Sequence, residues 1–267
     1  MPPLSTELDL ALDLARTAEA EILPRFRTVS VTRKPDGTEV TEADRVAERA
    51  MRERLADARP NHAVLGEEFG ESGPDDARYR WVLDPVDGTA GFTIGVPLFG
   101  TLVALLDDGE PVVGVIHFPA IRETVYAARG GGCYFRTADT ETTVAVNPVD
   151  ALRDATVTST ALHSSDVTAA DDQTPYRLTD VVRQAGKFRF VTDCLQHALV
   201  ARGRTHAAID TLMRPWDVAA LVPCVREAGG VAAPLSPGAD DVVFGGSLVT
   251  AGSEALLKDI RTRLQPQ

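Results

Sequence analysis

Cysteine is scarce in this sequence, and no stretch of it has the length and apolarity of a membrane span. The three cysteines, Cys133, Cys194 and Cys224, are odd in number and far apart, which argues against a disulfide framework or a zinc knuckle. A reducing cytoplasm therefore fits best. Residues 1–9 contain no basic patch followed by an apolar run, so no signal peptide is visible. No apolar stretch approaches the roughly 18 residues that a transmembrane helix needs.

Positive charge is also in short supply. The formal net charge of -12 and the pI of about 4.9 make a surface that repels nucleic acid. Any anionic substrate would need locally concentrated positive charge, and a bound metal ion is one way to supply it. The hydrophobic share of 44% and the charged share of 25% are ordinary for a globular protein, so long disorder and a fibrous fold are both excluded.

The pattern along the 267 residues changes near residue 150. Residues 1–150 predict an α+β half with two helices, at 5–23 and 41–58, and a largely antiparallel sheet. Thr41 is the expected N-cap of the second helix, with Asp44 three residues later. Residues 151–267 alternate between strand and helix, which indicates an α/β half. The elements expected there are strands at 156–159, 188–191, 206–209 and 248–251, and helices at 176–185, 193–202, 215–228 and the C-terminus.

The most informative segment is Trp81-Val82-Leu83-Asp84-Pro85-Val86-Asp87-Gly88-Thr89. An apolar strand delivers Asp84 at its end, and Pro85 is expected to stop strand pairing and turn the chain. Two ionised carboxylates this close repel each other, so a cation between them, or a proton on one of them, is required. Hard oxygen ligands favour magnesium. An Asp-Pro turn followed by an Asp-Gly turn is the alternative interpretation of the motif.

Other acidic residues could join this pair, and each has an ordinary structural alternative. Glu67, in Gly66-Glu67-Glu68, follows a short apolar strand, and two acidic clusters at strand ends in one sheet can converge on one pocket. It could equally belong to a solvated turn. Asp44 could be only a helix cap. Asp217 could be only a favourable charge in the first turn of a helix. Thr89 could cap a helix or orient a water molecule.

The three motifs together resemble the inositol monophosphatase superfamily. The match rests on Asp84-Pro85-Val86-Asp87-Gly88-Thr89, on the preceding Gly66-Glu67-Glu68 and on the following Trp216-Asp217-Val218-Ala219-Ala220. It covers nearly the whole chain, and the order and approximate spacing of the motifs agree. The resemblance implies a layered αβαβα sugar-phosphatase fold and a metal-dependent phosphoric monoester hydrolase. It also implies a homodimer that acts on a small phosphate ester. The acidic charge and the lack of a long apolar stretch argue against nucleic-acid and membrane partners.

The resemblance also implies roles for single residues. Two or three magnesium ions, with inhibition by lithium, would be held by Glu67, Asp84, Asp87, Asp217 and the carbonyl of Val86. Asp44 corresponds to the acid near a third, weaker ion. Glu67, Asp84 and Thr89 would be the catalytic residues, with Thr89 helping to activate the attacking water. Gly88 and Thr89 would hold the phosphate through backbone N–H groups.

Within the superfamily the sequence is closest to the histidinol-phosphate phosphatase branch. The segments that carry this similarity are Lys34-Pro35-Asp36, Gly66–Gly70, Gly95–Leu102 and Thr192-Asp193-Cys194. Asp193 and Asp210 are the expected substrate-binding residues. Two carboxylates would favour a cationic amine or imidazole, but they could equally accept hydrogen bonds from inositol hydroxyls. Asp193 could also simply cap the helix predicted at 193–202.

One departure from the branch concerns the substrate. Ala90-Gly91 stand where related enzymes commonly have a lysine and a small polar residue, so one positive charge near the phosphate is lost. Inositol-1-phosphate, or a broad range of sugar and nucleotide phosphates, therefore stay open as substrates. A non-catalytic metabolite sensor and a protein with purely structural cations are the hypotheses from other classes. The five histidines are expected to be structural or on the surface, with His163 as a guess for the pocket mouth.

Overall fold

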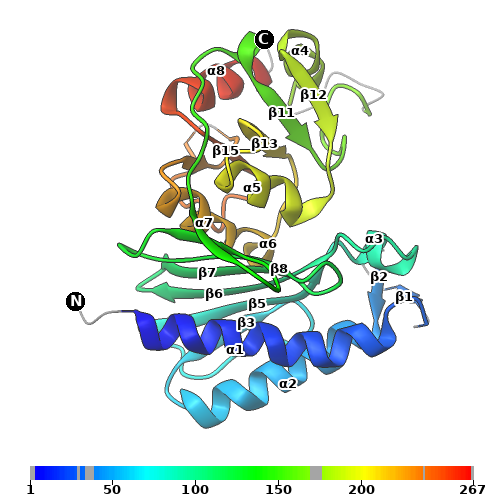
Figure 1. Cartoon of the computed structure of the whole chain (residues 1–267), viewed down its shortest axis with the longest axis vertical. Coiled ribbons are helices and arrows are strands. Elements are labelled where there is room, and N and C mark those ends of the chain that lie inside the picture. Colours follow the sequence, from blue (N-terminus) through cyan, green and yellow to red (C-terminus); the bar gives the residue numbers. More distant parts are fainter. Residues whose placement is uncertain (1–3, 29–30, 34–38, 169–175, 237, 266–267) are drawn as a thin grey trace.

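The chain folds into five layers, α, β, α, β, α, in the computed structural model, which describes residues 4–28, 31–33, 39–168, 176–236 and 238–265. Figure 1 shows helices α1 and α2 beneath a large sheet, a layer with α5, α6 and α7 above it, then a second sheet, and finally α4 and α8. The layered αβαβα prediction is confirmed. The segment Lys34-Pro35-Asp36 lies outside the described residues.

Helices α1 (Ser5–Ile22) and α2 (Glu42–Ala58) cover the outer face of the large sheet. Apolar residues at helical spacing, such as Leu10, Leu14 and Ala18, are buried in the core between these helices and the sheet. Thr41 and Asp44 form the predicted capping box at the start of α2. Pro24 lies in a short 3₁₀ turn, Leu23–Arg25, that ends the first helix.

The large sheet has eight strands in the order β10-β9-β8-β7-β6-β5-β3-β4. Its pairs are antiparallel, except that β3 and β5 are parallel neighbours. Strand β6 is buried along its whole length, because helices cover both faces of the sheet. A separate hairpin pairs β1 (Val31–Arg33) with β2 (Glu39–Thr41). The strands of the large sheet are β3 (Ala63–Gly66), β4 (Gly70–Ser72), β5 (Tyr79–Asp87), β6 (Gly100–Asp107), β7 (Glu110–Phe118), β8 (Glu123–Ala128), β9 (Cys133–Arg136) and β10 (Glu141–Val144).

The second sheet has five strands in the order β12-β11-β13-β15-β14. Strand β11 is parallel to β12 and β13, and β15 is antiparallel to both of its neighbours. The strands are β11 (Thr156–Ser159), β12 (Lys187–Phe190), β13 (Ala207–Asp210), β14 (Val231–Ala233) and β15 (Leu248–Ala251). The helices of this half are η2 (Leu152–Asp154), α4 (Leu178–Gln184), α5 (Asp193–Ala201), α6 (Pro215–Val218), α7 (Leu221–Glu227) and α8 (Glu254–Leu264).

Two local predictions are wrong, and proline explains both. The helix expected at 215–228 is interrupted between α6 and α7, because Pro223 has no N–H to bond the carbonyl of Ala219. Pro85 does not end strand pairing. Strand β5 continues to Asp87 through a bulge at which its register with β6 shifts, which accommodates a residue without an N–H.

No helix in the described part of the chain is both long and apolar enough to cross a bilayer. The core is instead divided among three apolar clusters, one on each side of the large sheet and one around the outer face of the second sheet. The cluster between the two sheets contains Cys194 and Cys224, which are buried packing residues as expected.

Candidate active site

The large sheet brings two acidic segments together at one edge. Because β3 and β5 are parallel neighbours, with Gly66 opposite Leu83, their carboxyl ends lie side by side. Glu67 follows β3, and its backbone N–H donates a hydrogen bond to the carbonyl of Leu83 at 3.2 Å. Asp84 comes next on β5. The topology therefore places the two strand ends side by side, while Glu67 itself stands outside the group of carboxylates that come within 4.8 Å of one another.

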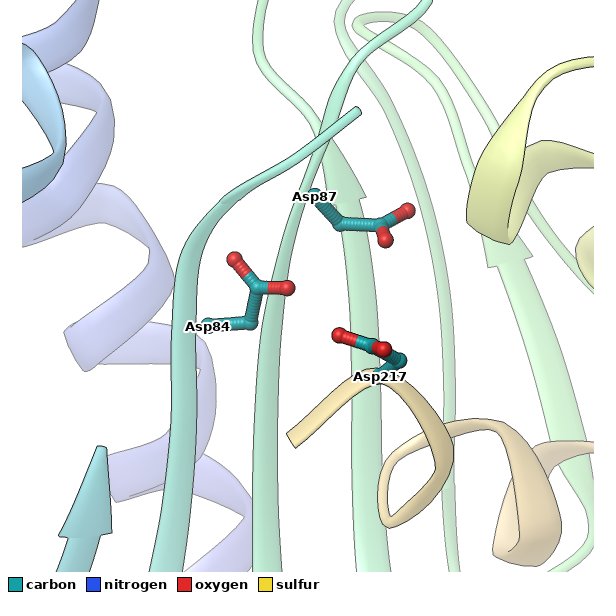
Figure 2. A group of neighbouring side chains, drawn as sticks. All are labelled: Asp84, Asp87 and Asp217. Carbon is teal, nitrogen blue, oxygen red and sulfur yellow. The ribbon is translucent and has the colours of Figure 1, made fainter. Parts of the chain in front are cut away.

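Three carboxylates converge on one small space at this edge. Asp84 and Asp87 project from β5, and Asp217 comes from the first turn of α6, as Figure 2 shows. One oxygen of each lies within 4.8 Å of the others. Asp84 is buried, and its Oδ1 has no hydrogen-bond partner. An unsatisfied buried carboxylate oxygen facing two more carboxylates is a donor set that suits a hard divalent cation.

Burial and mutual repulsion raise the pKa values of all three groups. Burial raises the pKa of Asp84 well above its usual range, and the charges of Glu67, Asp87, Asp217 and Asp44 add to the effect. Burial and the charges of Asp193 and Asp217 do the same to the pKa of Asp87. Burial raises the pKa of Asp217 to about 7. The cluster therefore favours either bound protons or a bound cation.

Two of the three acids, Asp87 and Asp217, accept hydrogen bonds from the backbone. Asp87 accepts a hydrogen bond from the backbone N–H of Cys194 at 2.7 Å, so the start of α5 fixes one of its oxygens. Asp217 accepts from the backbone N–H of Arg214 at 2.7 Å, as a first-turn acid does. The structural role that the sequence suggested for Asp217 thus exists, and the same side chain still reaches the cluster.

Asp44 is hydrogen-bonded to the start of its own helix. Its Oδ2 accepts from the backbone N–H of Thr41 at 2.9 Å and from the hydroxyl of Thr41 at 2.5 Å. Thr89 Oγ1 lies 3.3 Å from Asp44 Oδ1 and 3.0 Å from the carbonyl of Val86. Burial raises the pKa of Asp44. Asp44 therefore caps α2 and contacts Thr89, and it does not belong to the three-acid cluster.

The turn after Asp87 leads into a short helix, α3 (Thr89–Thr93), as the sequence suggested. Gly88 has a φ of 87°, a left-handed conformation that favours glycine. A Cβ at this position would lie 2.6 Å from Asp193 Oδ2, so the missing side chain also makes room for Asp193. The first-turn N–H groups of a helix have no partners within the helix.

A cavity of about 310 Å³ opens beside the acidic cluster. Asp87 and Asp217 line it together with both predicted substrate-binding residues, Asp193 and Asp210. His163 also lines it, so the guess about its location is met. Asp193 does not cap α5: the N-cap is Thr192, and the side chain of Thr192 makes no capping hydrogen bond. Burial, together with the charge of Asp210, raises the pKa of Asp193.

Sequence reasoning missed the residues that hold Asp210. His197 is fully buried and lies between Asp210 Oδ2, 3.0 Å from its Nε2, and the hydroxyl of Thr250, 2.8 Å from its Nδ1. Gln196 Nε2 donates to the same Asp210 oxygen at 2.6 Å and to Thr160 at 2.8 Å. Adjacent polar residues on an otherwise apolar helix were the signal that could have identified this pair.

Known proteins match the chain along nearly its whole length. The model of the inositol monophosphatase family matches residues 4–265. The chain belongs to the inositol monophosphatase family. A histidinol-phosphatase of Mycobacterium tuberculosis is 38% identical, over 96% of this chain and 97% of the relative. An inositol-1-monophosphatase of Mesorhizobium japonicum is 33% identical, over 89% and 88%.

Solved structures of similar proteins have the same fold as this chain. The extragenic suppressor protein SuhB of Bartonella henselae superposes with a TM-score of 0.84 and 28% identity, covering 97% of this chain and 98% of that chain. Membership of the inositol monophosphatase family makes the chain a phosphoric monoester hydrolase of a metal-dependent family. The three-acid cluster is the place in the described residues where the donor chemistry fits such a metal.

Proposed function

We propose that the chain is a magnesium-dependent phosphatase that hydrolyses histidinol phosphate to histidinol and inorganic phosphate. One observation carries the proposal: a carboxylate cluster with an unsatisfied buried oxygen borders a cavity that two further carboxylates line. The cluster suits a cation that binds phosphate, and the two further carboxylates, Asp193 and Asp210, suit a cationic substrate. When bound, a divalent cation supplies positive charge to the phosphoryl oxygens and lowers the pKa of a water molecule.

The proposed metal ligands are Asp84, Asp87, Asp217, Glu67 and the carbonyl of Val86. Glu67 stands outside the three-acid group, but its charge raises the pKa values of both Asp84 and Asp217, so it is electrostatically close to them. Two ions, and a third weaker one near Asp44, are part of the proposal, as is inhibition by lithium. Weak binding of the third ion is consistent with the two hydrogen bonds that Asp44 already accepts from Thr41.

Thr89 is the proposed residue that orients the attacking water. Its hydroxyl has one proton and two acceptors within reach, the carbonyl of Val86 and Asp44 Oδ1. With its proton donated to either acceptor, Oγ1 keeps lone pairs that can accept a hydrogen bond from water. The backbone N–H groups of Gly88 and Thr89 are proposed to hold a phosphate oxygen at the start of α3.

Asp193 and Asp210 are the proposed contacts to the cationic amine and imidazole of histidinol phosphate. Gln196 and His197 both bond Asp210 Oδ2, which orients this carboxylate at the cavity wall. The alternative substrate is inositol-1-phosphate, whose hydroxyls could donate hydrogen bonds to the same carboxylates. A broad-specificity sugar or nucleotide phosphatase is a further alternative, and a non-catalytic metabolite sensor is the alternative from another class.

The wider setting of the enzyme is also proposed from its sequence. We infer a homodimer in the cytoplasm, without nucleic-acid or membrane partners, because members of the superfamily are usually homodimers and the chain is strongly acidic. The division into halves at 1–150 and 151–267 stays a prediction. The two sheets fall on either side of this boundary.

A phosphate-release assay tests the proposal. The panel contains histidinol phosphate, inositol-1-phosphate, a sugar phosphate and adenosine bisphosphate, each with magnesium and with EDTA. We expect the highest kcat/KM for histidinol phosphate and no release with EDTA. Asp84→Asn should lower kcat by at least about 100-fold, since several kcal/mol of charge stabilisation depends on the cation.

Two further variants separate the substrate from the metal chemistry. Asp210→Asn should raise KM for histidinol phosphate about 10-fold, because a charged hydrogen bond is lost. The exposed Asp139→Asn, with the same change of charge, is the control and should behave like wild type. If kcat/KM for inositol-1-phosphate equals that for histidinol phosphate, the substrate assignment is wrong. Magnesium-dependent binding without turnover of any substrate in the panel would favour the non-catalytic sensor.

A further inference from the structure

Glu48 is a buried acid that the proposed chemistry does not use. It lies on α2 one turn after Asp44, and its side chain is completely buried. Three donors surround its carboxylate. Glu48 Oε2 accepts from the backbone N–H of Glu68 at 2.7 Å, and Oε1 accepts from the backbone N–H of Phe69 at 3.2 Å and from Arg52 Nε at 2.8 Å.

Arg52 extends the same hydrogen-bond network to the end of the turn between β3 and β4. Its Nη2 donates to the carbonyl of Gly70 at 2.5 Å, and its Nη1 donates to the hydroxyl of Ser72 at 2.7 Å. Glu48 and Arg52 are themselves an ion pair with little exposure, so neither charge is left uncompensated. Together the two side chains bind the turn from β3 to β4 at its start and at its end.

The turn is built around this ion pair. A Cβ at Gly66 would lie 2.0 Å from Glu48 Oε1 and 2.8 Å from Arg52 Nη2, so no larger residue fits there without displacing Glu48. Glycine at this position leaves space for the carboxylate. The close approach of β3 to the Glu48 side chain therefore depends on both Gly66 and Glu48.

We propose that Glu48 is the positioning residue for Glu67, and that it thereby sets the affinity of the active site for magnesium. The backbone N–H of Glu67 is bonded to Leu83 on β5, and the next N–H, of Glu68, is bonded to Glu48. The peptide units on both sides of Glu67 are thus fixed to different elements. The inference rests on the proposed function, in which Glu67 is a metal ligand.

Fixing the backbone around a ligand matters because the cation selects one geometry. If the turn were released, Glu67 would sample positions away from Asp84. Magnesium would then have to order Glu67 on binding, and this entropy cost would weaken its binding. Partners that orient metal ligands typically contribute 10- to 100-fold to metal affinity, as an order of magnitude. Glu48 acts on this account through the backbone of 67–69, without touching the cation.

The test is the affinity for magnesium, measured by isothermal titration calorimetry without substrate. Glu48→Gln places an amide group against three donors, so at least one hydrogen bond and the ion pair are lost. We expect magnesium to bind about 10- to 100-fold more weakly. Glu53→Gln is the matched control, an exposed acid on the same helix with the same change of charge, and should bind magnesium like wild type.

A double-mutant cycle separates positioning from general destabilisation. In a Glu67→Gln background, Glu48→Gln should weaken magnesium binding no further, because the residue through which it acts is gone. Additive losses in the two backgrounds would overturn the inference, as would wild-type affinity in Glu48→Gln. If Glu67→Gln alone leaves affinity unchanged, the ligand set of the proposed function is wrong.

A second variant guards against misfolding of Glu48→Gln. Arg52→Lys keeps a positive charge beside Glu48, but an ammonium group cannot replace the guanidinium bonds to both Gly70 and Ser72. The turn should loosen, and magnesium should bind more weakly than in wild type while the unfolding temperature in EDTA stays near that of wild type. Unchanged magnesium affinity in a folded Arg52→Lys protein would contradict the role assigned to this ion pair.

Discussion

At the scale of single residues, the site depends on acids that the fold holds together against their own repulsion. Asp84 has an oxygen without a partner, and burial raises the pKa values of Asp84, Asp87 and Asp217. Without a cation, the folded chain prefers protons on these groups. The unfolded chain has no such preference, so stability without metal must depend on pH.

The expected pH dependence follows from Asp217, whose pKa rises from 3.8 to about 7 on folding. A carboxyl group with a raised folded pKa stabilises the fold at low pH, and this contribution is lost as pH rises from about 4 to about 7. In EDTA, the unfolding temperature of wild type should therefore fall more steeply over this range than that of Asp217→Asn. Differential scanning fluorimetry measures both profiles.

Magnesium should act in the opposite direction, because ligands must lose their protons to bind it. The rise in unfolding temperature on adding magnesium should grow as pH passes through about 7. Parallel profiles for wild type and Asp217→Asn in EDTA would show that the raised pKa of Asp217 has no influence on stability.

Part of the site could be predicted from local sequence, and part could not. Asp84 and Asp87 stand three residues apart at the end of one apolar strand, so the sequence alone predicts that they lie close together. Asp217 is distant along the chain, and only the resemblance to a family linked it to them. Glu48 and His197 were missed because their roles come from packing against 66–69 and Asp210, which no local pattern reveals.

At the scale of elements, the site is formed where two strand ends and the first turn of α6 meet. Parallel pairing of β3 and β5 aligns Glu67 with Asp84, and α6 presents Asp217 across from them. Strand periodicity predicted these strands, but proline chemistry decided the details. The bulge at Pro85 and the break before Pro223 both arise from a missing N–H.

The contact between α6, α7 and the sheet leads to a prediction about stability. A Cβ at Gly114 on β7 would lie 2.2 Å from the carbonyl oxygen of Ala220, in the segment between the two helices. Gly114→Ala should therefore lower the free energy of unfolding by about 1–3 kcal/mol, the usual cost of overpacking. Urea unfolding followed by circular dichroism measures it.

Gly91 offers the control for this substitution. A Cβ at Gly91 meets its nearest atom at 3.8 Å, an ordinary contact, and the residue lies within α3. Gly91→Ala should leave stability unchanged or raise it by up to about 1 kcal/mol. Equal stability of Gly114→Ala and wild type would mean that the segment between α6 and α7 does not pack against β7 as described.

At the scale of the whole molecule, the five layers place α6, which carries Asp217, in the helical layer between the two sheets (Figure 1). The alternation of strands and helices after residue 150 predicted an α/β half, and the resemblance to the family predicted the layered fold. The order of strands within each sheet, and the antiparallel β15, could not be predicted because they depend on contacts far apart in sequence. The chain has a net charge of -12, and it brings three of its carboxylates together at a site where a bound cation can neutralise them.

Crystals grown with manganese can show whether Asp84, Asp87 and Asp217 hold a divalent cation. Manganese prefers the same oxygen ligands as magnesium and scatters X-rays anomalously. We expect an anomalous peak bounded by these three carboxylates in wild type, and a weaker peak or none in Asp84→Asn. Manganese bound elsewhere, with the three carboxylates free of metal in wild type, would show that this cluster is not the metal site.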